Sequence, residues 1–369
     1  MYKRIFASPS LSLKERMKRL IKYYFLVRGA RILWERRFKK VFSIFPEYGT
    51  KLSVDVEKEH KQYWLPFRKR CNMATMRLNS NISGQFKYKY IPEEIFMSDI
   101  EPTLNNIASV DYMNYKSLYN RWHRGELFPS DYIHNIEGEW LDKDLNAIDF
   151  KAVKAVAEKL DYPVVVKPNK DSYGGKGVQF PSNSGELIEI IKDKENIIVQ
   201  EKFKQHPFYN KYNTKGINSI RVNLYRSVKD KKWHVLNKTF RMGVGGSLDN
   251  ETAGGIVSLI NEEGNLNGFA VDKFGKKYLE HPDTKLPFDE AMLDMEGLDK
   301  AAIQVASKVF YARLVCLDLC YDSNGNWRLI EVNLNSSSIR LIQYHGALFF
   351  GDFTDEVHEY CLNNHWALS

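Results

Sequence analysis

Two mostly apolar segments near the C-terminus, separated by an Asn-Gly pair, constrain the fold more strongly than any other part of the sequence. Residues 314–322 and 327–333 are rich in Leu, Val, Ile and Cys, and Asn324-Gly325 lies between them. An Asn-Gly pair between two apolar runs is the strongest short-range signal for a β-hairpin. The sequence therefore predicts two adjacent antiparallel strands whose register is set by this turn.

The predicted register brings two carboxylates together. A two-residue turn pairs Ser323 with Asn326, and counting outward then places Asp318 opposite Glu331, on the face that also carries Asn333. Adjacent like charges destabilise a hairpin, whereas a divalent cation would turn the repulsion into coordination. Asp, Glu and Asn supply the oxygen ligands that Mg²⁺ accepts beside water and phosphate. The hairpin thus predicts a Mg²⁺ site and a magnesium-nucleotide enzyme; the alternative is a solvated face with two unrelated acids.

Length and composition indicate two or three domains of an ordinary globular protein. The chain has 369 residues, of which 43% are hydrophobic and 27% charged, enough for a sizeable core. No apolar run approaches the roughly 20 residues that span a bilayer, and we expect no secretory signal. The cysteines (Cys71, Cys316, Cys320 and Cys361) lack metal-site spacing, which fits buried thiols in a reducing cytoplasm.

The net charge of +8 is concentrated at the N-terminus. Residues 1–40 contain thirteen Lys or Arg and two Glu, a charge of +11, so the remainder carries 8 − 11 = −3. A helical stripe runs through this segment: Leu13, Met17, Leu20, Tyr24 and Val27. Such a basic helix can lie on anionic lipid at the inner face of the membrane, or pack on the body with its basic face in solvent; the sequence favours packing, with Gly29 as a candidate break. No nucleic-acid-binding module accompanies the charge, so nucleic acid is not an expected partner.

The rest of the chain mixes predicted strands and helices without a repeat. The clearest strands are 88–97, 129–136, 162–166, 197–199, 217–226, 233–242, 253–261 and 266–273, and the clearest helices are 111–122, 150–160, 298–311 and 349–363. Antiparallel hairpins combined with helices indicate an α+β fold rather than a series of βαβ units. We expect four regions: a basic helical extension (1–45), a lead-in domain (46–150), a subdomain with a Gly-rich loop (151–205) and a second subdomain with the metal hairpin and a final helix (206–369).

A Gly-rich segment follows the strand that ends at Val166. It reads Lys167-Pro168-Asn169-Lys170-Asp171-Ser172-Tyr173-Gly174-Gly175-Lys176-Gly177. Glycines let backbone N–H groups approach an anion closely, and lysines flank them. The segment lacks the spacing of a Walker A loop, and no helix opens behind it as in a dinucleotide-binding fingerprint. Taken alone, it predicts either a phosphate-binding loop or an ordinary Gly-rich hairpin loop.

The order of these motifs resembles the ATP-grasp superfamily. That order is a strand, Lys-Pro, a Gly-rich loop, a strand ending in Gln200-Glu201, and a late hairpin with Asp and Glu-x-Asn. A closer resemblance, over most of residues 88–360, is to the sugar-transfer-associated ATP-grasp family, whose members accompany polysaccharide and capsule gene sets. It rests on short matches at 91–96, 100–105, 115–119, 218–222, 241–247, 249–250, 253–256, 281–284 and 330–333. The resemblance implies an ATP-grasp fold in which two α+β subdomains clasp ATP.

The resemblance also implies nucleotide-binding residues. They are Lys116, Lys167, Gly174, Gly175, Lys176, Gly177, Gln200, Glu201, Lys202, Phe203, Asp318 and Glu331. The two lysines before the loop would neutralise phosphates, the Gly-rich segment would close as a lid, and residues 200–203 would form the hinge that binds adenine and ribose. For the lysines the alternative is an ordinary solvated side chain.

Three implied catalytic residues are Arg221, Arg241 and Lys176. Arg221 would face the γ-phosphate or the developing acyl phosphate, and Arg241 a phosphate or a substrate carboxylate, because guanidinium groups bind such anions in pairs of hydrogen bonds. The alternative for each arginine is a surface ion pair. The implied substrate contacts are Arg241, Ser247, Asn250, Gly254, Gly255, His281 and Asn335.

These roles together imply an ATP-grasp ligase that converts ATP to ADP and phosphate and forms a C–N bond through an acyl phosphate. The expected co-substrates are an amino acid and a sugar, such as an aminosugar or a uronic acid that is free, nucleotide-bound or lipid-linked. The expected process is surface polysaccharide biosynthesis. Two alternatives stay open: a sugar-directed kinase on the same fold, and a catalytically weak adaptor of a glycosyltransferase assembly. The sequence leaves the oligomeric state undetermined.

Overall fold

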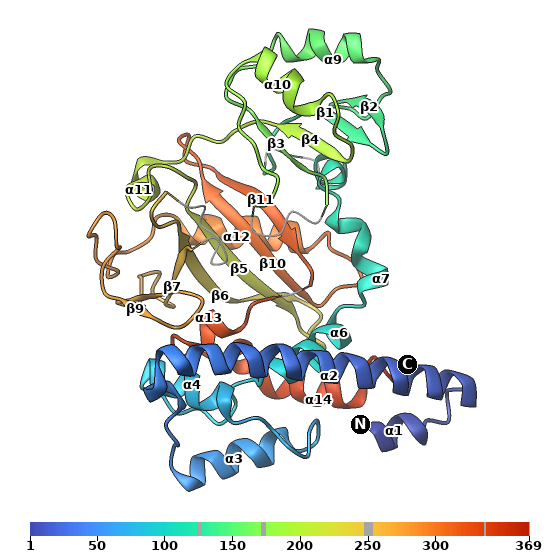
Figure 1. Cartoon of the computed structure of the whole chain (residues 1–369), viewed down its shortest axis with the longest axis vertical. Helices are drawn as coiled ribbons and strands as arrows, with labels where there is room; N and C mark the ends of the chain where they lie inside the picture. The colour runs from blue at the N-terminus through green and yellow to red at the C-terminus, as the bar shows by residue number, and fades with distance from the viewer. Residues whose placement is uncertain (124, 126, 171–174, 247–253, 336, 369) are drawn as a thin grey trace.

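The chain forms three layers along its long axis (Figure 1). A computed structural model describes residues 1–123, 125, 127–170, 175–246, 254–335 and 337–368. A small sheet with two helices lies at one end, a seven-stranded sheet lies in the middle, and a layer of helices from both ends of the chain lies at the other end. The mixture of antiparallel sheets and helices confirms the predicted α+β class.

The small sheet has four antiparallel strands in the order β2-β1-β4-β3. Its elements are β1 (Asp131–Ile136), β2 (Glu139–Asp142), β3 (Val165–Pro168) and β4 (Ile197–Gln200), with α9 (Phe150–Ala157) and α10 (Ser184–Ile191). Val166 and Val199 pack with these helices in one apolar cluster. Lys167 pairs with Ile198, so Lys167 and Gln200 occupy the opposite, uncovered face. The expected division at residue 150 does not coincide with this sheet, because β1 and β2 pair in the sheet that contains β3 and β4.

The large sheet is antiparallel throughout, in the order β11-β10-β5-β6-β7-β8-β9. The strands are β5 (Ser219–Arg226), β6 (Trp233–Met242), β7 (Ile256–Ile260), β8 (Ala270–Val271), β9 (Lys277–Tyr278), β10 (Leu314–Tyr321) and β11 (Trp327–Asn333). One face is apolar and packs on α12 (Met295–Ala306), with α11 (Pro207–Asn210) at its edge. Strand alternation puts polar side chains on the other face: Arg221, Asn223, Thr239, Arg241, Asp318, Glu331 and Asn333.

The β10–β11 hairpin confirms the predicted juxtaposition of Asp318 and Glu331, which are direct cross-strand partners. The predicted two-residue turn is wrong. The Asp322 N–H donates to the Asn326 carbonyl at 2.9 Å, which leaves a three-residue loop. Gly325 in this loop has φ +80°, a conformation that such loops require and that glycine adopts freely.

This longer loop would shift the strand pairing by one residue if nothing corrected it. Next to the loop Tyr321 pairs with Trp327, one residue away from the predicted register. An irregularity between Asp318 and Leu319, where Leu319 lies opposite Leu329, restores the register farther along the strands. A β-bulge thus returns both carboxylates to the same face.

The third layer is helical. Its N-terminal elements are α1 (Tyr2–Phe6), α2 (Leu13–Ile44), η1 (Pro46–Gly49), α3 (Val54–Trp64), α4 (Ala74–Ser83), α5 (Glu93–Ile95), η2 (Phe96–Ile100) and α6 (Glu101–Leu104). The segment α7 (Ile107–Val110), η3 (Asp111–Asn114), η4 (Lys116–Leu118) and α8 (Tyr119–His123) leads from this layer to the small sheet, and α13 (Arg340–Gln343), η7 (Gly351–Phe353) and α14 (Thr354–Asn363) return to it. The predicted strand at 88–97 is wrong, because this apolar run is buried in α5 and η2, and a short apolar run has no period that separates strand from buried helix.

Helix α2 is continuous through Gly29, so the candidate break is wrong. Ser12 and Glu15 form a capping box at its start. The predicted packing stripe is also only partly buried, since Leu13, Met17 and Tyr24 are exposed, whereas Leu20 and Val27 pack against the cluster of Ile5, Tyr23 and Ala367. The buried stripe is Tyr23, Ala30, Trp34, Phe38 and Val41. The helix carries two apolar stripes, and helical periodicity alone does not show which one meets the body. No helix among the described residues is long and apolar enough to cross a membrane.

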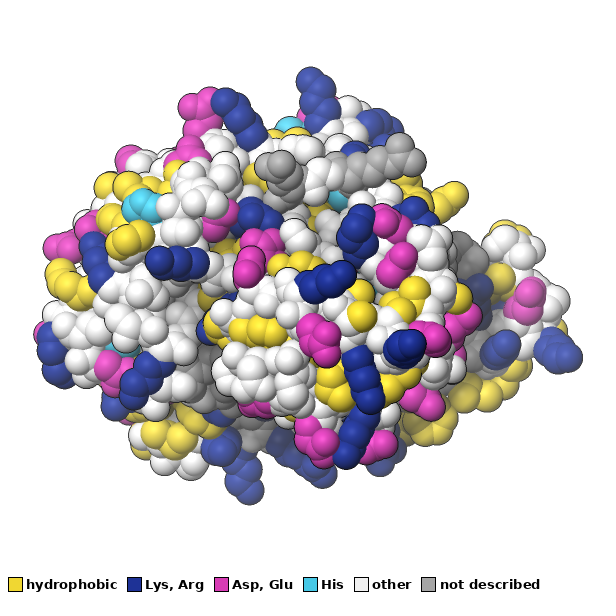
Figure 2. Space-filling model, turned by 90° about the horizontal axis from the view of Figure 1, so that it is seen from above, with side chains coloured by type: hydrophobic (Ala, Val, Ile, Leu, Met, Phe, Trp, Pro, Cys, Tyr) yellow, Lys and Arg dark blue, Asp and Glu magenta, His cyan; other side chains and the backbone are white. Residues whose placement is uncertain are grey.

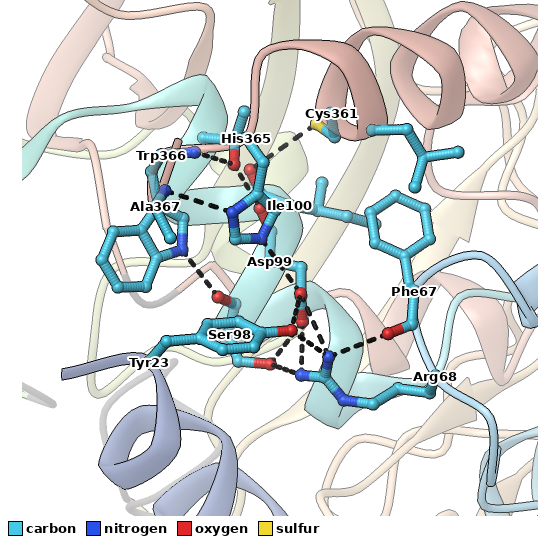
Figure 3. Close-up of polar contacts among 12 residues, drawn as sticks. Tyr23, Phe67, Arg68, Ser98, Asp99, Ile100, Cys361, His365, Trp366 and Ala367 are labelled. Carbon is cyan, nitrogen blue, oxygen red and sulfur yellow. Dashed lines mark hydrogen bonds and ion pairs between the residues drawn. The ribbon is translucent and has the colours of Figure 1, made fainter. Parts of the chain in front are cut away.

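A buried carboxylate holds the helical layer together (Figure 3). Asp99 is fully buried in η2 and accepts hydrogen bonds from Tyr23 at 2.7 Å, Arg68 at 2.6 Å and Ser98 at 2.6 Å, while His365 Nε2 lies 3.0 Å away. Burial by itself would raise the pKa of Asp99, but the His365 hydrogen bond and the Arg68 charge outweigh it and lower the pKa. The cluster joins α2, the segment after α3, η2 and the C-terminus.

We predict that Asp99→Asn lowers the free energy of unfolding by about 3 kcal/mol or more, because it leaves the Arg68 guanidinium buried without its counter-charge. The control is Asp355→Asn, which removes a partly exposed carboxylate from Lys89 and Tyr63 and should cost less than about 1 kcal/mol. Urea denaturation of the two variants measures the difference. Equal midpoints for both variants would contradict the role given to Asp99.

Candidate nucleotide-binding site

The uncovered face of the small sheet and the polar face of the large sheet meet at a cluster of charged side chains. Lys167 comes from β3, Arg221 from β5, Arg241 from β6 and Asp318 from β10. Lys116 Nζ lies 3.0 Å from Glu331 Oε1 on β11, and the Lys116 N–H donates to the carbonyl of Asn169, which directly follows β3, so the two faces lie close together. The structure therefore brings the predicted phosphate-binding and metal-binding residues into one site.

Asp318 lies at the centre of this site and is 6% exposed. Arg221, its cross-strand neighbour, donates two hydrogen bonds to it, Nε to Oδ1 at 2.8 Å and NH2 to Oδ2 at 2.7 Å. Arg241 NH1 lies 3.0 Å from Oδ1. Burial would raise the pKa of Asp318, but the two guanidinium groups lower it to about 2. The carboxylate is therefore charged, and both arginines face the site rather than forming surface ion pairs.

Glu331 forms the second ion pair, with Lys116 Nζ 3.0 Å from its Oε1. Lys116 is only 3% exposed, and its backbone is fixed by Asn169, which directly follows Lys167-Pro168. The Lys116 N–H donates to the Asn169 carbonyl at 2.9 Å, and the Ser117 N–H donates to Asn169 Oδ1 at 2.8 Å. Asn169 thereby joins the two lysines, a role that the sequence reasoning missed although the residue lies inside the quoted motif.

Lys167 is buried with only part of its charge balanced. Burial, together with the positive charge of Lys116, lowers its pKa to about 8, while Glu331 and Asp131 act in the opposite direction. A buried ammonium group beside a second ammonium group favours an incoming anion, because the anion stabilises the protonated form. This is the electrostatic behaviour expected of a phosphate-binding lysine.

The segment after β4 runs beside the β10–β11 hairpin. Glu201 Oε2 accepts from the Ser130 N–H and from Arg328 NH2, both at 3.1 Å, so this carboxylate is engaged by the protein itself. The Arg328 guanidinium also lies 4.3 Å from the centre of the buried Phe203 ring. Lys202 is exposed and lies over Phe180. Arg328 was missed because its role depends on contacts between the two sheets.

Gln200 carries an unpaired buried acceptor. Its Nε2 donates to Asp131 Oδ1 at 2.6 Å, whereas its Oε1 has no hydrogen-bond partner among the described residues. Such a group is costly to bury. A ligand amino group that donated to Gln200 Oε1 would remove that cost.

Val166 and Gln179 lie on either side of the Gly-rich segment and exchange two backbone hydrogen bonds at 2.9 and 2.8 Å. Gly175 and Gly177 have φ +75° and +81°, and Lys176 is exposed. Gly174 lies outside the described residues.

The predicted substrate residues are less completely placed than the charged cluster. Ser247 and Asn250 lie outside the described residues. Gly254 and Gly255 directly precede β7, and Asn335 follows β11. Both ring nitrogens of His281 are used within the protein, since Nε2 lies 3.1 Å from the Gly243 carbonyl and Nδ1 accepts from the N–H of Asp283 at 3.3 Å. In this structure His281 therefore fixes the 281–284 turn against Gly243.

The candidate metal ligands Asp318, Glu331 and Asn333 fit a metal ion only if an anionic ligand completes its coordination. The described residues contain no group of three or more His, Cys, Asp or Glu side chains suited to hold a metal. Asp318 is held by two arginines, and Asn333 Nδ2 donates to Asp318 at 3.3 Å. Two carboxylates and one amide oxygen agree with a Mg²⁺ ion that completes its coordination with phosphate and water.

We predict that ATP affinity falls as the pH rises through about 8. Below this value Lys167 is protonated and attracts phosphate; above it the proton must be taken up on binding, which weakens affinity by up to about tenfold per pH unit. Isothermal titration calorimetry between pH 7 and 9.5 measures the affinity for ATP. Lys167→Met should bind more weakly and lose the pH dependence, whereas Lys159→Met, at an exposed position of the small subdomain, should retain it. Affinity of the unmodified protein that does not change with pH would contradict the assignment.

Comparison with known proteins gives a family and several distant structural similarities. A family model described as "Sugar-transfer associated ATP-grasp" matches residues 96–349. No curated protein matches the sequence.

Three solved structures illustrate the similarity. N5-carboxyaminoimidazole ribonucleotide synthetase with ADP shares 12% identity at a TM-score of 0.38, over 62% of this chain and 46% of that chain. The biotin carboxylase domain of Hydrogenobacter thermophilus 2-oxoglutarate carboxylase, with MgADP and bicarbonate, shares 12% at 0.36, over 64% and 45%. D-alanine–D-alanine ligase from Bacillus anthracis shares 14% at 0.40, over 70% of each chain. The chain thus spans about half the length of the first two.

The family match agrees with the resemblance inferred from the sequence and with the architecture of two sheets that meet at a charged cluster. Because the model covers 254 of the 369 residues, well over half, this protein belongs to the sugar-transfer associated ATP-grasp family.

Proposed function

We propose that the protein is a Mg-ATP-dependent carboxylate–amine ligase. The observation that carries the proposal is the convergence of four cationic side chains on two strand carboxylates. Lys116, Lys167, Arg221 and Arg241 surround Asp318 and Glu331. With Asp131, which also acts on Lys167, four positive and three negative charges leave 4 − 3 = +1, a surplus that suits a polyphosphate better than a neutral ligand.

ATP would lie between the two sheets. Lys116 and Lys167 would neutralise its phosphates, and the Gly-rich loop with Lys176 would cover them and exclude water. The adenine would lie at residues 200–203, where the unpaired Gln200 Oε1 can accept from its amino group and Phe203 supplies apolar surface. Glu201 would contact the ribose only with its second carboxylate oxygen, because the first is bound to Ser130 and Arg328.

Asp318, Glu331 and Asn333 would hold Mg²⁺, which would supply positive charge to balance the phosphates of ATP. In the absence of ligand, the arginines and Lys116 keep these carboxylates in place. The same cations can then turn toward the incoming phosphates, so the site is arranged before the nucleotide binds. Such preorganisation lowers the free energy needed to reach the transition state.

The proposed reaction has two steps that balance without an additional reactant. A substrate carboxylate oxygen bonds to the γ-phosphorus as the bond to ADP breaks, which gives an acyl phosphate and ADP. An amine then bonds to the acyl carbon, phosphate leaves with the C–O electron pair, and the amine loses a proton. Arg221 and Arg241 would stabilise the charge on the transferred phosphoryl group and on the substrate carboxylate.

The family suggests where this chemistry is used. We propose an amino acid and a sugar as co-substrates in surface polysaccharide biosynthesis, with Arg241, Ser247, Asn250, Gly254, Gly255, His281 and Asn335 near the acceptor. His281 would act there by positioning Gly243. The proposal includes a cytoplasmic location at the inner face of the membrane, which residues 1–45 would contact. The free, mostly buried cysteines support a reducing compartment.

We predict that Glu331→Ala lowers ATP turnover by at least about 100-fold, because it removes a metal ligand and the counter-charge of buried Lys116. Glu280→Ala is the matched control, since Glu280 forms an exposed ion pair with Lys285 on the same domain. ADP release measures turnover, and circular dichroism verifies that both variants are folded. Retained turnover in a folded Glu331→Ala protein would exclude the metal assignment.

Product analysis separates the ligase from a kinase. With Mg-ATP, pooled amino acids and nucleotide-linked aminosugars or uronic acids, a ligase releases ADP and phosphate in equal amounts and yields a product equal to two substrates minus water. Mass spectrometry identifies that product and both partners. A substrate that gains one phosphoryl group without release of phosphate would establish a kinase instead. ATP binding without turnover on any substrate pool would favour the adaptor.

A further inference from the structure

The N-terminal helices expose an unusual number of large apolar side chains. Of the 21 such side chains exposed among the described residues, eight lie within residues 2–32: Tyr2, Phe6, Leu13, Met17, Ile21, Tyr24, Phe25 and Ile32. Leu13 and Phe25 are 68% and 66% exposed. Isolated exposed apolar residues are common on protein surfaces, but a contiguous set marks an interaction surface.

Four of these side chains form one row on α2. Leu13, Met17, Ile21 and Phe25 are spaced four residues apart, so they lie one above another along the helix. A second row, Lys14, Lys18 and Lys22, lies directly beside the first, and all three lysines are exposed. An apolar row edged by lysines is the pattern of a helix that lies in the plane of an anionic membrane surface.

The opposite face of α2 is already occupied. Tyr23 is buried in a cluster with Ile5 and Ala367, and it hydrogen-bonds the buried Asp99. Arg19 donates to the Trp366 carbonyl at 2.6 Å. The body therefore fixes the rotation of the helix about its axis, and this rotation leaves the row from Leu13 to Phe25 on the outside.

We infer that this outer face of α2, with α1 beside it, binds the surface of an anionic phospholipid bilayer. The apolar side chains enter the boundary between headgroups and acyl chains, and the lysines pair with lipid phosphates. A second copy of the chain does not fit as the occupant, because it would bring two lysine rows of the same charge together. Nucleic acid would leave the apolar row in water.

The position of α2 agrees with this role. The first part of α2 and α1 project beyond the sheets at the end of the molecule that lies opposite the small sheet (Figure 1). The opposite end, which carries the small sheet, is seen from above in Figure 2, and basic and acidic side chains are interspersed over its surface. The inference is independent of the proposed ligase activity.

Sedimentation with lipid vesicles tests the inference on the full chain. Phosphatidylcholine vesicles that contain roughly 30–40% phosphatidylglycerol should bind the protein at least about tenfold more tightly than vesicles of pure phosphatidylcholine. Added salt should weaken this binding. Lys14→Glu with Lys18→Glu should remove the preference for anionic lipid. Ile21→Glu with Phe25→Glu should lower binding at least about tenfold even at low salt, because the apolar contribution is lost.

Two matched double variants serve as controls. Leu279→Glu with Tyr311→Glu changes two apolar side chains that are 74% and 76% exposed elsewhere, and Lys151→Glu with Lys159→Glu changes two exposed lysines of the small subdomain. Both should bind vesicles like the unmodified protein, and all variants should retain ATP turnover. Equal binding to neutral and anionic vesicles, absence of binding, or a dimer in light scattering that the Ile21 and Phe25 changes disrupt would overturn the inference.

Discussion

The ion pairs of Asp318 constrain the rest of the site. The carboxylate on β10, the second strand of a seven-stranded sheet, loses its hydration, and an isolated buried charge costs several kcal/mol. The adjacent strand β5 and the next strand β6 compensate with Arg221 and Arg241, which lie on the same face of the sheet. These cations make that face polar while the reverse face packs on α12. The same pairing that makes the fold possible thereby creates the anion-binding surface.

The cluster combines a stable resting arrangement with an affinity for anions. Each carboxylate has a cation in the described structure, so neither is left buried without a partner. The cations outnumber the carboxylates, and Lys167 is held with a lowered pKa of about 8. A polyphosphate would relieve the repulsion between Lys167 and Lys116. The free energy of that relief contributes to binding, which connects the electrostatics of folding with the proposed function.

The helical layer also contains a buried carboxylate that is paired with an arginine, and this pair stabilises the packing of the layer. Asp99 is as deeply buried as Asp318, and Arg68 neutralises it in the same way. Here Tyr23 and His365 complete the contacts, so the cluster joins the two ends of the chain. Because Tyr23 is fixed, the rotation of α2 is fixed as well. Together with the packing of Trp34, Phe38 and Val41, this buried contact determines which apolar row of the helix meets solvent.

The sequence by itself determined the α+β class, most strands of the two sheets, and the facing pair of Asp318 and Glu331, because these depend on local periodicity and turn chemistry. It also identified the family through ordered short motifs. The tertiary structure decided what depends on contacts between distant segments. These include the bulge that corrected the hairpin register, the ion pairs of Asp318, the joining of Lys116 to Lys167 by Asn169, and the role of Arg328 between the sheets. The tertiary structure also decided which face of α2 is buried, because the local sequence of a helix with two apolar rows does not indicate which row packs against the body.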